Sequence, residues 1–155
     1  MSDWPPADGL PSFVGRAAYS HATPSASDAS AKIMVFVEVP PLGRITAMLD
    51  TGAPYFIVPP EQAKALALSP EAGDGGVTLH VRGHATPGHL HRLTLTLVAT
   101  HGNALQLEAT VFVPATEGVG RYPAVIGYHC CLDRLVFAVD GPKELLYFGD
   151  ASGSL

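Results

Sequence analysis

The segment from Thr46 to Pro60 reads TAMLDTGAPYFIVPP and places an acidic residue inside an apolar run. Asp50 follows three apolar residues, and large apolar side chains resume at Tyr55. A carboxylate among apolar side chains is costly unless other groups bind it. Two interpretations of Asp50 follow: an ordinary turn residue at the end of a strand, or a catalytic acid.

Length and composition favour a single globular domain. The chain has 155 residues, of which 47% are hydrophobic and 15% charged, so it can form a substantial core. Its 9 basic side chains are outnumbered by 14 acidic ones and form no cluster, so no nucleic-acid partner is expected. No run reaches the roughly 18 apolar residues of a membrane-spanning helix, so no membrane partner is expected either.

The cysteines and the N-terminus suggest a cytoplasmic location. Cys130 and Cys131 are neighbours and cannot link distant parts of this chain, which is typical of a reducing compartment. Both are expected to be small buried side chains. The N-terminal segment has prolines and acidic residues and lacks the apolar core of a secretory signal.

Strand-like alternation begins at Lys32 and continues to Gly149. Residues 1–31 are small, polar and without period, and are predicted to form a flexible arm, with residues 150–155 as a tail. The apolar patterns predict strands over residues 32–39, 44–50, 77–83, 89–100, 104–114, 124–127, 136–140 and 144–149. Short helices are expected within residues 60–68 and 128–135. Strands without a βαβ rhythm indicate an all-β barrel or sandwich.

Two motifs in this order resemble those of a known family. The first is Asp50-Thr51-Gly52-Ala53 after an apolar strand, and the second is the apolar segment Ala124–Gly127 before a predicted helix. With a long hairpin between them, the sequence resembles the retropepsins, the single-domain aspartic proteases of retroviral type, and their bacterial relatives. The resemblance covers residues 32–149. It implies an all-β closed barrel, equivalent to half of a two-lobed acid protease, with a flap hairpin and one or two short helices.

The resemblance assigns roles to the motif residues. Asp50 would be catalytic, Thr51, Gly52 and Ala53 would shape the active-site loop, and the loop would be supported by Ile126 and Gly127. Two adjacent carboxylates cannot both ionise cheaply, so they share a proton. The ionised carboxylate then activates a water molecule and the protonated one donates to the peptide carbonyl. This chemistry needs no metal and no cofactor.

The number of such motifs predicts a homodimer. A catalytic pair needs two Asp-Thr/Ser-Gly loops, and the chain has one. Asp140-Gly141 lacks the hydroxyl residue. A second copy related by a two-fold axis would supply the second Asp50. The expected function is therefore an aspartic endopeptidase that cleaves extended, apolar peptide segments as a homodimer.

The hairpin between the motifs is predicted to be the flap. Its tip is expected at Ala85–Gly88, so that the substrate-binding residues are His84, Ala85, Thr86, Pro87 and Gly88. A peptide or protein substrate would bind as an added strand beneath it.

Three observations leave alternatives open. The same fold could be a non-catalytic peptide- or protein-binding module whose aspartates are idle. Four histidines gather near the hairpin and could form a metal site, although solvated side chains are the favoured interpretation: His80, His84, His89 and His91. Related proteins often have an arginine soon after the second motif. Here Tyr128 follows instead, and Arg134 could replace a dimer contact made by that arginine.

Overall fold

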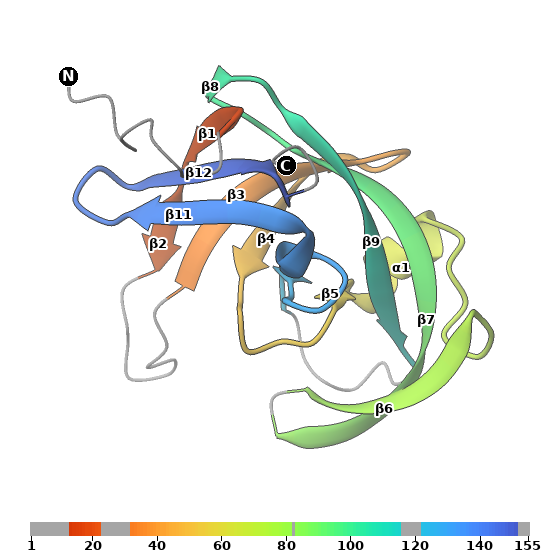
Figure 1. Ribbon diagram of the computed structural model, residues 1–155. Coiled ribbons are helices and arrows are strands. Elements are labelled where there is room, and N and C mark those ends of the chain that lie inside the picture. The colour runs from red at the N-terminus through yellow and green to blue at the C-terminus, as the bar shows by residue number, and fades with distance from the viewer. Residues whose placement is uncertain (1–12, 23–31, 82, 116–121, 152–155) are drawn as a thin grey trace.

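Six strands close into a barrel in the computed structural model, which describes residues 13–22, 32–81, 83–115 and 122–151 (Figure 1). In order around the barrel they are β3 (Lys32–Val39), β4 (Gly43–Leu49), β10 (Ala124–Ile126), β5 (Phe56–Ile57), β9 (Leu105–Pro114) and β7 (His84–Leu97). The barrel closes because β7 also pairs with β3, joining Val37 to Leu97. The predicted all-β closed barrel is confirmed.

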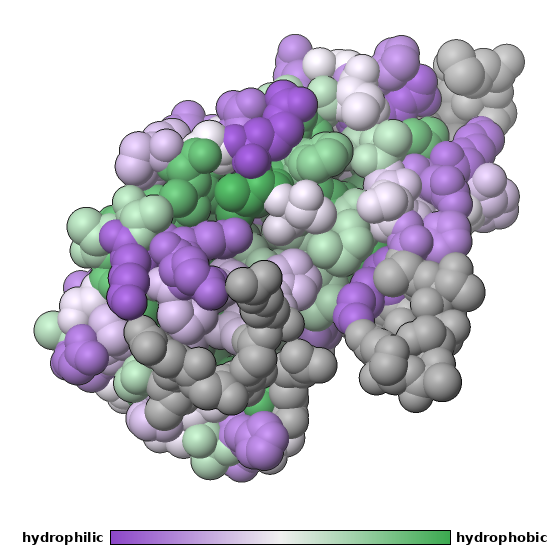
Figure 2. Space-filling model, turned by 180° about the vertical axis from the view of Figure 1, so that it is seen from behind, coloured by the Kyte–Doolittle hydropathy of each residue, from purple (hydrophilic) through white to green (hydrophobic). Residues whose placement is uncertain are grey.

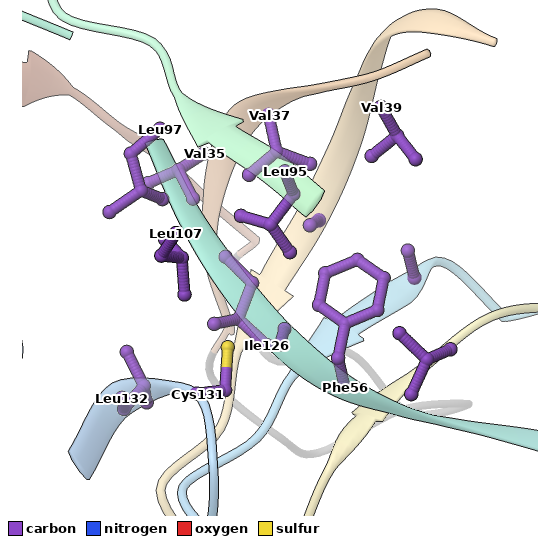
Figure 3. Close-up of a cluster of buried hydrophobic side chains, with 14 of the residues drawn as sticks. Val35, Val37, Val39, Phe56, Leu95, Leu97, Leu107, Ile126, Cys131 and Leu132 are labelled. Atoms are coloured by element: carbon purple, nitrogen blue, oxygen red, sulfur yellow. The ribbon is translucent and has the colours of Figure 1, made fainter. Parts of the chain in front are cut away.

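Alternating side chains fill the barrel. Along β3, Val35, Val37 and Val39 are buried while Phe36 and Glu38 point outward. The inner residues meet others from β5, β7, β9 and β10, including Phe56, Leu95, Leu107 and Ile126 (Figure 3). Burial of such aliphatic and aromatic side chains contributes about 1.5–3 kcal/mol each. The core therefore holds together strands that are far apart in sequence.

A four-stranded sheet covers one end of the barrel, at the upper left of Figure 1. Its order is β11 (Leu135–Asp140), β12 (Leu145–Asp150), β1 (Gly15–Ala18) and β8 (His101–Gly102). A further strand, β2 (Ser20–Ala22), pairs with β3 in the main sheet.

The strands β1 and β2 correct the prediction of a flexible arm over residues 1–31. β1 is too short and too rich in small residues to show alternation, but it pairs with β12 on one side and β8 on the other. Gly15 permits this pairing, since a Cβ there would lie 3.0 Å from the Phe148 ring. The remainder of the predicted arm, residues 1–12 and 23–31, lies outside the described residues. At the other end Asp150 belongs to β12, and residues 152–155 are not described.

The two predicted short helices are present. Helix α1 (Pro60–Ala65) has proline at its first turn, where a missing N–H costs nothing. It ends before Ala67, whose φ of 56° is left-handed. The 3-10 helix η1 (Leu132–Arg134) follows a turn after β10. Within the described part, neither helix has the length or the hydropathy needed to cross a bilayer.

The hairpin between the two motifs is longer than the turn signals indicate. β6 (Gly75–Val81) pairs with the first half of β7, and the register joins Val81 to His84 and Val77 to Gly88. The turn therefore lies between Val81 and His84, and the prediction of a tip at Ala85–Gly88 was wrong. Pro87 suggested a turn, but it lies opposite Thr78 within the strand pairing, and its carbonyl accepts the N–H of Ala115 (2.8 Å).

Candidate active site

Parallel pairing of β4 with β10 brings the two sequence motifs together. The register joins Ala47 to Ala124 and Leu49 to Ile126, so both strands end at the same edge. Asp50 continues this ladder, because its N–H donates to the Ile126 carbonyl at 3.0 Å. The catalytic candidate and the apolar support predicted behind it are therefore neighbours.

The loop after β4 binds its own carboxylate. The Gly52 N–H donates to Asp50 Oδ1 at 2.8 Å, and the Ala53 N–H donates to the Asp50 carbonyl at 3.2 Å. Asp50 is half-buried, whereas Thr51 and Gly52 are exposed. One carboxylate oxygen is thus held by the backbone while the loop that carries it faces solvent. This arrangement orients Asp50 without burying it.

Gly127 locks the loop from the side of β10. A Cβ at this position would lie 2.7 Å from the backbone nitrogen of Tyr55, so only glycine fits this approach. The next residue, Tyr128, donates its N–H to the Ala53 carbonyl at 2.7 Å. The support role predicted for Ile126 and Gly127 thus has a direct geometric basis, through one hydrogen bond and one close backbone approach.

An apolar cluster connects the Asp50 loop to the hairpin. Its buried members are Ile57, Val81, Phe112 and Val125. Partly buried side chains pack against it from the loop, the hairpin and the neighbouring strands: Met48, Ala53, Tyr55, Val77, Leu79, Leu90 and Tyr122. Figure 1 shows the hairpin extending beyond the barrel at the end opposite the four-stranded sheet. The cluster therefore places apolar side chains next to the partly exposed Asp50 carboxylate.

The five residues predicted to form the flap occupy the first part of β7. His84, Ala85 and Pro87 are exposed. Thr86 is buried, and its Oγ1 donates to the His84 carbonyl at 3.0 Å. Gly88 is also buried, and it packs so closely that a Cβ there would lie 2.7 Å from the Phe112 ring. The two buried residues of this segment, Thr86 and Gly88, therefore position the hairpin on the barrel.

Comparison with known proteins shows that this chain resembles some of them in structure. No family model matches the chain, and no curated protein matches it in sequence. The chain shares its fold with basic 7S globulin from soybean. That match has a TM-score of 0.53 at 13% identity and covers 92% of this chain but only 52% of the globulin. The chain is also similar to a retropepsin-like aspartic protease from Rickettsia conorii, with a TM-score of 0.49, 19% identity and coverage of 84% and 93%.

Two of the four histidines near the hairpin are hydrogen-bonded to backbone carbonyls. His89 Nδ1 lies 2.8 Å from the Pro70 carbonyl and His91 Nε2 lies 2.7 Å from the Ser69 carbonyl, so each ring donates an N–H to the loop after α1. His80 and His84 are exposed. No group of three or more metal-binding side chains occurs within residues 13–22, 32–81, 83–115 and 122–151.

Cys131 and Arg134 are also occupied by structural roles. Cys131 is fully buried, and burial raises the pKa of its thiol to about 12. Such a thiol stays protonated and is a poor nucleophile. Arg134 Nη1 donates to the Glu108 carbonyl at 2.6 Å. Within the monomer, Arg134 therefore binds β9 of its own chain.

Sequence reasoning missed the aromatic and ionic groups that flank the Asp50 loop. The Tyr55 ring packs edge-on against the His129 ring at 5.8 Å, and His129 Nδ1 lies 3.4 Å from Asp133 Oδ2. Asp133 Oδ1 also accepts the Cys131 N–H at 3.2 Å. The i, i+4 spacing of His129 and Asp133 was the available signal. Tyr122, beside the cluster, has a pKa raised to about 12, mainly by burial.

A cavity of about 480 Å³ lies away from the Asp50 loop. It is lined by Leu105, Gln106, Leu107, Glu108, Arg134, Leu135, Asp150 and Ala151. None of these residues belongs to the two motifs or to the hairpin. The face shown in Figure 2 carries both apolar and polar side chains, and the apolar ones gather mainly in its upper half. The candidate site is therefore defined by the Asp50 loop and its contacts rather than by the cavity.

Proposed function

We propose that this chain is one subunit of a homodimeric aspartic endopeptidase. The observation that carries the proposal is the setting of Asp50: a half-buried carboxylate fixed by the Gly52 N–H at 2.8 Å, next to an apolar cluster and on a loop that faces solvent. The sequence contains one such Asp-Thr-Gly loop, so the chain supplies one of the two carboxylates that the chemistry needs.

Asp50 acts as general base and general acid in the proposed dimer. Two Asp50 carboxylates face one another across the axis and hold one proton between them. The ionised one removes a proton from a water molecule, and the resulting oxygen attacks the carbonyl carbon of the peptide bond. The protonated one donates to the carbonyl oxygen, and a proton is returned to the leaving nitrogen as the bond breaks.

The remaining groups position loop and substrate. The Gly52 N–H keeps the Asp50 carboxylate in one orientation, and Gly127 holds the loop against β10. The hairpin of β6 and β7 covers the peptide, and the apolar cluster beneath it selects uncharged side chains. Thr51, exposed in the monomer, faces the second copy.

Replacing Asp50 with asparagine tests the proposal. We expect Asp50→Asn to abolish cleavage of a peptide library between about pH 3 and 7, because asparagine can neither remove the water proton nor share one. Cleavage is followed by mass spectrometry, which also reports whether the cut segments are apolar. Circular dichroism and sedimentation confirm that fold and dimer persist.

The matched control is Asp140→Asn, since Asp140 is also followed closely by a glycine but ends β11, outside the two motifs. This variant should keep full activity. Cleavage that survives in Asp50→Asn would overturn the assignment. A wild-type protein that cleaves no peptide, yet binds extended peptides, would instead be the non-catalytic module.

A further inference from the structure

The surface beside the Asp50 loop carries an exposed aromatic residue whose backbone is hydrogen-bonded to that loop. Tyr128 is 49% exposed. Its N–H donates to the Ala53 carbonyl at 2.7 Å, and its own carbonyl accepts the N–H of Cys131 (3.3 Å) and of Asp133 (3.0 Å). These bonds fix the Tyr128 backbone relative to the Asp50 loop, while the residue remains exposed to solvent.

The other large exposed side chains differ from Tyr128. Phe36, 51% exposed on the outer face of β3, lies under the Arg44 guanidinium at 5.9 Å from its ring centre. Val139, 43% exposed, belongs to β11 at the edge of the four-stranded sheet. In the described part of the chain, no aromatic or cationic group covers the Tyr128 ring in a comparable way.

We propose that Tyr128 anchors the contact between two copies of this chain. The inference rests on the proposed function, which requires two Asp50 loops to meet on a two-fold axis. The Tyr128 N–H donates to Ala53 of that loop, so the residue lies beside the surface that would meet the second copy. Tyrosine is frequent among the few residues that dominate binding energy, because it buries a large area and loses little entropy.

The Asp133 carboxylate near Tyr128 has partners within its own chain. The chain has a formal net charge of −5, so two copies repel at long range. Beside Tyr128, however, the Asp133 carboxylate binds the Cys131 N–H and lies within 3.4 Å of His129. Asp50 is another acid on this surface, and in the proposed dimer the two copies share one proton between their Asp50 side chains. The uncharged Tyr128 ring offers apolar contact without adding to the repulsion between copies.

The test is the dimer dissociation constant of Tyr128→Ala, measured by sedimentation equilibrium. We expect it to rise about tenfold or more, as is usual for an anchor residue. The matched control is Phe36→Ala, which removes an aromatic ring of nearly equal exposure from β3 and should leave the dimer dissociation constant unchanged. Tyr128→Phe keeps the ring and should dimerise like the wild type. Circular dichroism confirms that each variant is folded.

Activity separates an interface role from a catalytic one. At concentrations high enough to restore the dimer of Tyr128→Ala, cleavage per dimer should return to the wild-type value. Unchanged dimerisation of folded Tyr128→Ala, or a wild type that stays monomeric at every concentration, would overturn the inference. If Tyr128 governs dimerisation but no Asp50-dependent cleavage occurs, the interface stands and the proposed function is wrong.

Discussion

The hydrogen bond from the Gly52 N–H decides how Asp50 is presented. It fixes Oδ1 at 2.8 Å from that nitrogen and leaves the other carboxylate oxygen to other partners. A charge-assisted bond of this kind orients a carboxylate at moderate cost, because the side chain is only half-buried. The strongest constraint on the loop comes instead from Gly127, where no side chain fits.

Substituting Gly127 should therefore distort the site and destabilise the fold. We expect Gly127→Ala to lower the free energy of unfolding by about 1–3 kcal/mol, since the added methyl group meets the Tyr55 backbone, which cannot move freely. Urea denaturation measures this change. Gly141→Ala is the control, because a Cβ at Gly141 has no atom within 4 Å. Equal stability of the two variants would contradict the close approach described here.

Burial of Cys131 makes its thiol unreactive. Its pKa is raised from 9.0 to about 12, first by burial and then by Asp133. In a Cys130→Ala background, Ellman's reagent at pH 8 should label Cys131 only after unfolding. Because the thiol ionises more easily in the unfolded chain, stability should be unaffected below pH 9 and fall as pH rises from 9 towards 12. Rapid labelling of the native protein would show that the thiol is accessible.

At the level of elements, two histidines fix the loop between α1 and β6 to the base of the hairpin. His89 and His91 lie on one face of β7 and donate to consecutive carbonyls, those of Pro70 and Ser69. The Asp74 N–H adds a bond to the Leu90 carbonyl at 2.8 Å.

Removing either ring should loosen this loop. We expect His89→Ala and His91→Ala each to cost about 1 kcal/mol of stability and to speed amide hydrogen exchange at Ala72 and Asp74. His80→Ala, an exposed histidine on β6, is the control and should change neither quantity. Exchange that is unaltered in all three variants would mean that the loop is held mainly by backbone contacts.

At the level of the whole molecule, the proposed function makes activity depend on association, because the sequence contains one Asp-Thr-Gly loop. Mixing wild-type protein with an equal amount of Asp50→Asn should lower wild-type activity by about half once subunits exchange, since mixed dimers contain one working carboxylate. Adding buffer or the Asp140→Asn variant should cause no loss. Peptide cleavage at several subunit ratios measures this, and activity that ignores the added variant would indicate a site complete within one chain.

The local pattern of the chain already contained much of the fold and site. Alternation along residues 32–39 and 44–50 predicted β3 and β4 to within a residue, because a half-buried strand shows its two faces directly in sequence. Asp50 and its glycine were found for a similar reason: an acid followed by small residues inside an apolar run has few explanations. The apolar run before Gly127 marked β10 in the same way.

Other features depended on contacts between distant segments. β1 carries no alternation, and becomes a strand because β12 and β8 offer unpaired edges on both sides of it. The hairpin extends to Val81 and His84 because register with β6 outweighs the turn preference of Pro87 and Gly88.

The sequence by itself therefore determined a single Asp-Thr-Gly loop between apolar strands, which is the half-site of the proposed dimer. Only the tertiary structure decided how that loop is supported and which side chain stands exposed beside it. Strand faces and turn residues are local properties, readable from a few neighbours. The pairing of β4 with β10, the approach of Gly127 to Tyr55 and the exposure of Tyr128 follow from closure of the whole barrel.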